Sequence, residues 1–90
     1  MPYEVGINVL KREKLDLWST ITILEGLEDE LRVATGKLPN EATQTRVMLV
    51  NFQNEIGARI FQLHEKMREV GISLARETEA LDKARMQSRS

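Results

Sequence analysis

The most regular hydrophobic pattern in the chain runs from Val47 to Ala84. Apolar residues recur there at alternating spacings of three and four for about five heptads, which is typical of a helix that buries one face. Core position a is filled by Gln53, Ile60, Met67, Leu74 and Leu81. Core position d is filled by Leu49, Ile56, Leu63, Val70, Glu77 and Ala84. No proline interrupts the segment, and the pattern keeps its frame across Gly71. We therefore predict one continuous helix over about residues 41–86.

A second apolar face precedes this segment, with Leu10, Leu17, Ile21, Leu24 and Leu31 at helical spacing. It predicts a helix over about residues 8–35, with Asn8 as the N-cap because its side chain can accept from free backbone N–H groups. The β-branched run 19–23 has low helix propensity, but the in-phase leucines on both sides favour a helix. Residues 1–7 contain Pro2 and Gly6 without helical periodicity and predict an extended arm.

The segment Gly36-Lys37-Leu38-Pro39-Asn40 separates the two helices. Glycine suits the left-handed position after a helix, proline cannot continue that helix, and Asn40 can cap the next one. A connection of this length joins antiparallel neighbours. The predicted fold class is all-α: an antiparallel helical hairpin with a turn at 36–40. It forms a single domain over residues 8–87, between the arm at 1–7 and a frayed C-terminus at 88–90.

The two predicted helices differ in length, and this difference indicates a partner. Because both rise by the same distance per residue, facing residues are expected to have numbers that add to about 76. The first helix then ends opposite residue 68, leaving Leu74, Leu81 and Ala84 uncovered. The apolar arc of the first helix is also too wide for one facing helix. We therefore expect oligomerisation to complete a four-helix bundle or coiled coil.

Composition excludes several classes of protein. The 90 residues include no cysteine, so disulfides and thiolate metal sites are excluded. A net charge of −1 argues against nucleic-acid binding. No apolar run is long enough to span a membrane. The first residues lack a signal-peptide pattern, which leaves the cytoplasm or export without a cleavable signal peptide.

Side chains capable of catalysis or metal binding are sparse. His64 is the only histidine, and the expected register places it near Glu13, with Arg68 one turn along. The Glu-Xaa-Xaa-His spacing of di-iron bundles is absent because residue 61 is Phe61. We therefore predict no catalytic, cofactor-binding or metal-binding residue, and a protein that is not an enzyme.

Three polar or small residues fall at or beside the predicted core. Glu28 is expected to pair with Arg46 or Arg32. A buried amide at Gln53 would set the register or the oligomeric state. Gly57 is expected opposite Ser19 and beside Trp18. With His64 and Gly71 it forms a row of small side-chain volume suited to a neighbouring helix or to the N-terminal arm, and a ligand groove is the alternative.

These observations favour a non-enzymatic module for protein–protein interaction or oligomerisation through helix faces. Its partner is itself, as a homodimer or higher oligomer, or another helical protein. The alternatives are a small secretion-associated hairpin protein, as subunit or chaperone, and a small nucleic-acid-binding regulator. The predicted interface residues are Leu17, Trp18, Ile21, Leu24, Leu31, Leu49, Gln53, Ile56, Ile60, Leu63, Met67, Val70, Leu74 and Leu81.

The secretion alternative comes from a resemblance of shape. A cysteine-free hairpin with the turn residues Leu38-Pro39-Asn40 and the region around Gln53 resembles type III secretion needle subunits and their chaperones. It also resembles type VII secreted proteins, which carry a Trp-Xaa-Gly motif. Here Trp18 is followed by Ser19 and Thr20, so that motif is absent. The resemblance implies a helical hairpin and identifies no family.

Overall fold

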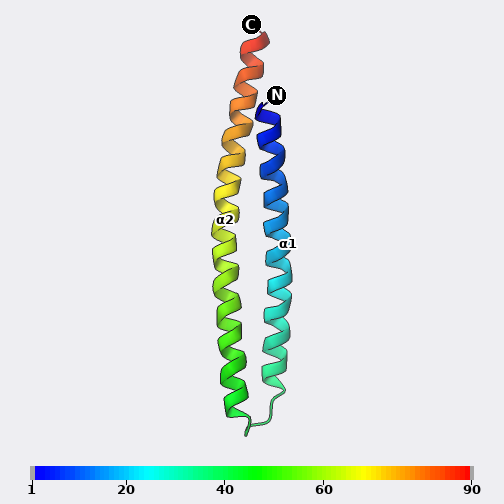
Figure 1. The fold of residues 1–90 in the computed structure, drawn as a ribbon, viewed down its shortest axis with the longest axis vertical. Helices are drawn as coiled ribbons and strands as arrows, with labels where there is room; N and C mark the ends of the chain where they lie inside the picture. Colours follow the sequence, from blue (N-terminus) through cyan, green and yellow to red (C-terminus); the bar gives the residue numbers. More distant parts are fainter. Residues whose placement is uncertain (1, 90) are drawn as a thin grey trace.

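Two long antiparallel helices make up the structure, a computed structural model that describes residues 2–89 and the side chains of residues 5–88. Helix α1 spans Pro2–Gly36 and helix α2 spans Thr43–Arg89. They lie side by side along their length, and the C-terminal end of α2 projects beyond the start of α1 (Figure 1). The molecule measures 75 × 14 × 14 Å. The described residues contain no strand, which confirms the prediction of an all-α helical hairpin.

The N-terminal segment differs from the prediction. Residues 2–7 are helical and continue into α1, so the expected extended arm is wrong, and Asn8 lies inside the helix instead of capping it. Proline is favoured in the first turn of a helix, where its missing N–H has no intrahelical acceptor. Ile7 adds one more apolar position to the face of α1 and is buried. Burial of Ile7 favours the helical conformation that the glycine by itself disfavours.

The turn between the helices is longer than the sequence indicated. It occupies residues 37–42, and the first α2 backbone bond joins the N–H of Arg46 to the carbonyl of Ala42 at 3.0 Å. Asn40 therefore lies within the turn and does not cap α2. Gly36 is the last residue of α1 but does not adopt the left-handed conformation predicted for it. No described glycine has a positive φ. The guanidinium of Arg46 donates to the carbonyls of Leu38 and Pro39, at 3.3 and 3.4 Å.

Both helices continue through the segments where a break was conceivable. Helix α2 passes through Gly71 without interruption, as predicted. Helix α1 passes through the β-branched run, where the hydroxyls of Thr20 and Thr22 donate to the carbonyls of Asp16 and Trp18 at 2.9 Å. Helix α2 continues to Arg89, beyond its predicted end near residue 86, and Ser90 lies outside the described residues.

The register of the hairpin is shifted from the expected one. A Cβ placed on Gly57 would lie 3.4 Å from the carboxylate of Glu28, and one on Gly6 would lie 3.9 Å from that of Glu77. Facing residues therefore have numbers that add to about 84, eight more than expected, which is a shift of about two helical turns. With the earlier start of α1, this shift leaves only a short end of α2 beyond α1. Leu81, which we expected to be uncovered, is buried within the hairpin.

Candidate interaction surface

The residues predicted as an interface lie almost all between α1 and α2. Thirteen of the fourteen are buried or half-buried, in the line of contact that we call the seam. Leu17, Ile21, Val70 and Leu81 are its most enclosed members in that set. Trp18 is the exception, because 57% of its surface is exposed. The seam residues hold the hairpin together, and their contact with another molecule stays a prediction.

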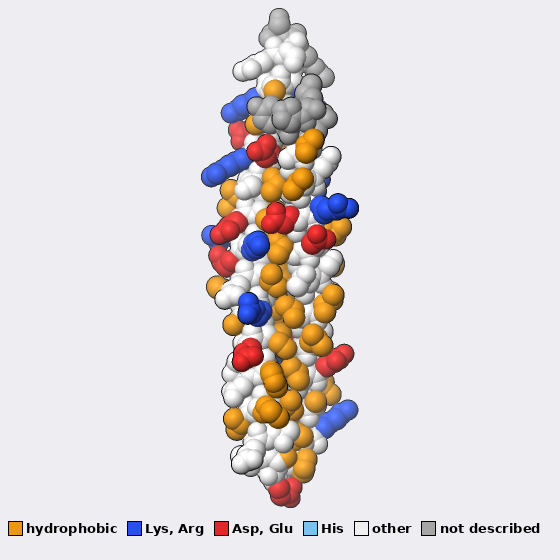
Figure 2. Space-filling view, viewed as in Figure 1, with side chains coloured by type: hydrophobic (Ala, Val, Ile, Leu, Met, Phe, Trp, Pro, Cys, Tyr) orange, Lys and Arg blue, Asp and Glu red, His pale blue; other side chains and the backbone are white. Residues whose placement is uncertain are grey.

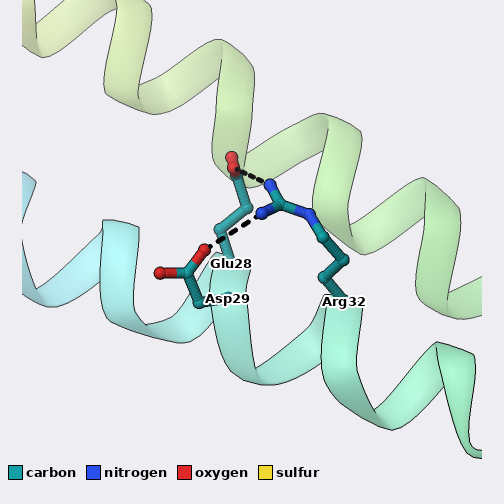
Figure 3. Close-up of polar contacts among 3 residues, drawn as sticks. All are labelled: Glu28, Asp29 and Arg32. Atoms are coloured by element: carbon teal, nitrogen blue, oxygen red, sulfur yellow. Dashed lines mark hydrogen bonds and ion pairs between the residues drawn. The ribbon is translucent and has the colours of Figure 1, made fainter.

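Glu28 occupies a half-buried position in the seam. Its carboxylate accepts from Arg32 at 2.9 Å, and Arg32 also donates to Asp29 at 3.2 Å (Figure 3). Of the two partners expected for Glu28, Arg32 is therefore correct and Arg46 is wrong. Gly57 faces this carboxylate, not Ser19 as predicted, and its missing side chain leaves room for the carboxylate between the helices.

Gln53 carries a buried polar group without a partner. Its side-chain nitrogen Nε2 is enclosed and forms no hydrogen bond. An unsatisfied buried donor costs roughly 1–3 kcal/mol relative to one that is hydrogen-bonded. The sequence pattern placed Gln53 in the seam correctly, and we expect its unpaired amide nitrogen to lower the stability of the isolated hairpin.

The imidazole of His64 lies across from Glu25, with 3.9 Å between Nε2 and Oε1. Glu25 replaces the predicted neighbour Glu13 because of the shifted register. Both side chains are more than half exposed, so the pair contributes little to stability even when His64 is protonated. Among the described residues, no group of three potential metal ligands converges on one point.

Large apolar side chains remain exposed along the whole hairpin. Among the described side chains, those of residues 5–88, fourteen are exposed: Val5, Val9, Leu15, Trp18, Ile23, Leu27, Val33, Val47, Met48, Val50, Phe52, Phe61, Ile72 and Met86. On the face shown in Figure 2, hydrophobic side chains form a strip along the half nearest the turn, and charged side chains are more frequent toward the other end. Among the side chains of residues 5–88, five apolar ones are buried: Ile7, Leu17, Ile21, Val70 and Leu81. The hairpin thus leaves many of its large apolar side chains exposed.

The accessible surface of the chain is large for its mass. It measures 7132 Å² for 10.3 kDa. A compact monomer of that mass would expose about 5,350 Å², so the hairpin exposes roughly 1,800 Å² more. A stable protein–protein interface needs about 800 Å² from each partner. The extended shape therefore provides enough surface for a second molecule on one side.

Two faces flank the seam. The first, which we call the His64 face, carries Trp18 and Glu25 on α1 and His64 on α2. Trp18 and Glu25 are seven residues apart and so lie on one side of α1, and the contact between Glu25 and His64 shows that this side of α1 and the His64 side of α2 flank the seam together. Gly57 and Gly71 lie seven residues before and after His64 and therefore share this face.

An open hollow on the His64 face is lined by Leu15, Trp18, Leu74 and two lysines. Phe61 lies one turn from His64 on the outer side of the same face. By the heptad frame, Leu27 and Phe52 belong to the second face, on the other side of the seam. Leu15 and Phe61 were not among the predicted interface residues. The sequence signal that could have identified them is that each is a large apolar residue outside core positions a and d.

Comparison with known proteins gives no family, because no family model, curated protein or solved structure matches the chain. Neither α1 nor α2 has a stretch apolar enough to cross a membrane. The geometry of the hairpin is therefore the basis for any functional conclusion.

Proposed function

We propose that the protein is a non-enzymatic interaction module, which assembles with itself or with another helical protein by packing helix faces together. The observation that carries this proposal is the set of fourteen large apolar side chains that the hairpin leaves exposed. Single exposed apolar residues are ordinary on protein surfaces, but rows of them along both sides of a two-helix seam are typical of an interaction surface.

Energetics support the same conclusion. Burial of apolar surface contributes about 25 cal/mol per Å², so a helix face that contributes several hundred Å² can stabilise a complex by many kcal/mol before the cost of association. Two antiparallel helices form a thin core, whereas two hairpins packed together form a four-helix bundle with a core on all inner faces. Assembly would therefore supply the burial that the single hairpin lacks.

The test is the solution mass of the purified chain by sedimentation equilibrium at several concentrations. We expect a multiple of 10.3 kDa, or a stoichiometric helical partner that co-purifies with the tagged chain from its source. A triple variant with serine at Trp18, Phe52 and Phe61 should lose assembly, while circular dichroism at 222 nm confirms that it stays helical. A wild-type chain that remains a monomer at every concentration and co-purifies alone would refute the proposal.

A further inference from the structure

We propose that the partner is a second copy of this chain, packed on the His64 face in antiparallel orientation, with the two turns at opposite ends and a two-fold axis at the level of His64. This inference rests on the proposed function and specifies its partner, its surface and its geometry. In this arrangement, α1 of one copy lies along α1 of the other, and α2 lies along α2.

Charge complementarity determines the orientation. Residues 20–65, the half that contains the turn, carry seven acidic and four basic side chains, whereas the rest of the chain carries nine basic and seven acidic ones. An antiparallel pair places the acidic half of each copy beside the basic half of the other. A pair with both turns at one end would place like charges together. Complementary charge of this kind fixes register and excludes wrong arrangements.

The charge clusters of α1 also locate the axis. Residues 11–14 carry three basic side chains and one acidic, and residues 25–30 carry four acidic side chains and no basic one. A two-fold axis brings these two clusters together when it passes midway between them, near residue 20. Because facing residues across the hairpin add to about 84, residue 20 of α1 lies at the level of His64 on α2.

The glycines of α2 independently place the two-fold axis at the level of His64. Gly57 and Gly71 are each seven residues from His64, so an axis there places Gly57 of one copy opposite Gly71 of the other. A Cβ on Gly71 would meet nothing within 4 Å in the hairpin, whereas one on Gly57 would lie 3.4 Å from the carboxylate of Glu28. Helix α2 is therefore open at Gly71 and partly covered by Glu28 at Gly57. Helix axes approach to 8–10 Å depending on the side chains between them, and glycine permits the shorter distance.

The exposed aromatic side chains lie near this axis. Trp18 is two residues from residue 20, and Phe61 is three residues from His64. Their exposed fractions, 57% and 67%, leave most of each ring available to a partner. Residues that dominate binding are enriched in aromatics and lie near the centre of an interface. Charge, backbone shape and aromatic position thus converge on one level of the His64 face.

The surface is tested by comparing Phe61→Asp with Phe52→Asp. Both residues are exposed phenylalanines on α2 in the acidic half, but Phe52 lies on the other face, so it is a matched control. We expect Phe61→Asp to raise the dimer dissociation constant at least about 30-fold, the loss typical of a central aromatic, and Phe52→Asp to change it less than about threefold. Circular dichroism checks that both variants remain helical.

The orientation is tested with spin labels, because the chain has no cysteine of its own. Labels on Asn40→Cys, in the turn, should lie about 65 Å apart across the antiparallel dimer, and within about 30 Å if both turns are at one end. Labels on Glu65→Cys, beside the axis, should be close in either arrangement and confirm that labelled dimers form.

Each contrary result has a defined meaning. A dimer that loses affinity with Phe52→Asp but not with Phe61→Asp, or whose turn labels are close together, overturns this inference and leaves the proposed function intact. A monomer that instead binds a different helical protein also overturns it and supports the broader proposal. A monomer without any partner overturns both.

Discussion

Ile21 is the most enclosed of the described residues, at 2% exposed, and Ile23 is two positions away on the same helix at 65%. Because successive residues of a helix are about 100° apart, these two isoleucines lie on nearly opposite sides of α1. Replacing each by alanine therefore makes the same chemical change at a buried and an exposed site. Both replacements raise helix propensity by the same few tenths of a kcal/mol, which cancels in the comparison.

The expected magnitude for Ile21→Ala follows from the three carbon atoms removed. At about 0.8 kcal/mol for each buried methylene, the loss of transfer free energy is roughly 2–3 kcal/mol. A cavity left at this nearly enclosed site would add to that loss, so 2–3 kcal/mol is the lower part of the range of about 2–5 kcal/mol for such replacements. Ile23→Ala should change the free energy of unfolding by less than about 0.5 kcal/mol, as expected for a surface site.

Urea denaturation followed by circular dichroism at 222 nm measures both variants at one protein concentration. With a slope of about 1 kcal/mol per molar urea, the lower end for small domains, Ile21→Ala should lower the midpoint by about 2 M. The midpoint of Ile23→Ala should stay near that of the wild type. If Ile23→Ala lost as much stability as Ile21→Ala, the rotation of α1 about its axis would be wrong, and a different row of residues would form the seam.

Three further substitutions test the polar seam, a glycine and the turn. Gln53→Leu should raise the free energy of unfolding by about 1–2 kcal/mol, because it removes a buried donor without a partner; lower stability would show that the amide is satisfied in solution. Gly26→Ala should stabilise α1 by about 0.5–1 kcal/mol, since a Cβ there meets nothing within 4 Å; a lower melting temperature would contradict the open environment. Arg46→Ala should cost about 0.5–1 kcal/mol by removing the bonds to the carbonyls of Leu38 and Pro39, and an unchanged urea midpoint would mean that these bonds do not hold the turn.

The spacing of apolar residues was sufficient to predict the fold class and the residues of the seam. Every a and d position named for α2, from Leu49 to Ala84, is half-buried or buried. The same frame correctly carried α2 through Gly71, because a helix that buries one continuous stripe loses more by breaking at a glycine than by tolerating it. These features depend on the helical period, which is written in the order of the residues.

The register and the N-terminal helix required the tertiary structure. Local signals at Pro2, Gly6 and Asn8 indicated an arm and a cap, but burial of Ile7 against the hairpin favours a helix from Pro2. The sequence placed His64 near Glu13, whereas the structure places it near Glu25, because a heptad pattern by itself is compatible with more than one register of the two helices. What selects one register is which side chains fit across the seam, such as Glu28 over Gly57. Amino-acid order thus determined which faces are apolar, and only the packing of α1 on α2 decided which of those faces remain open to a partner.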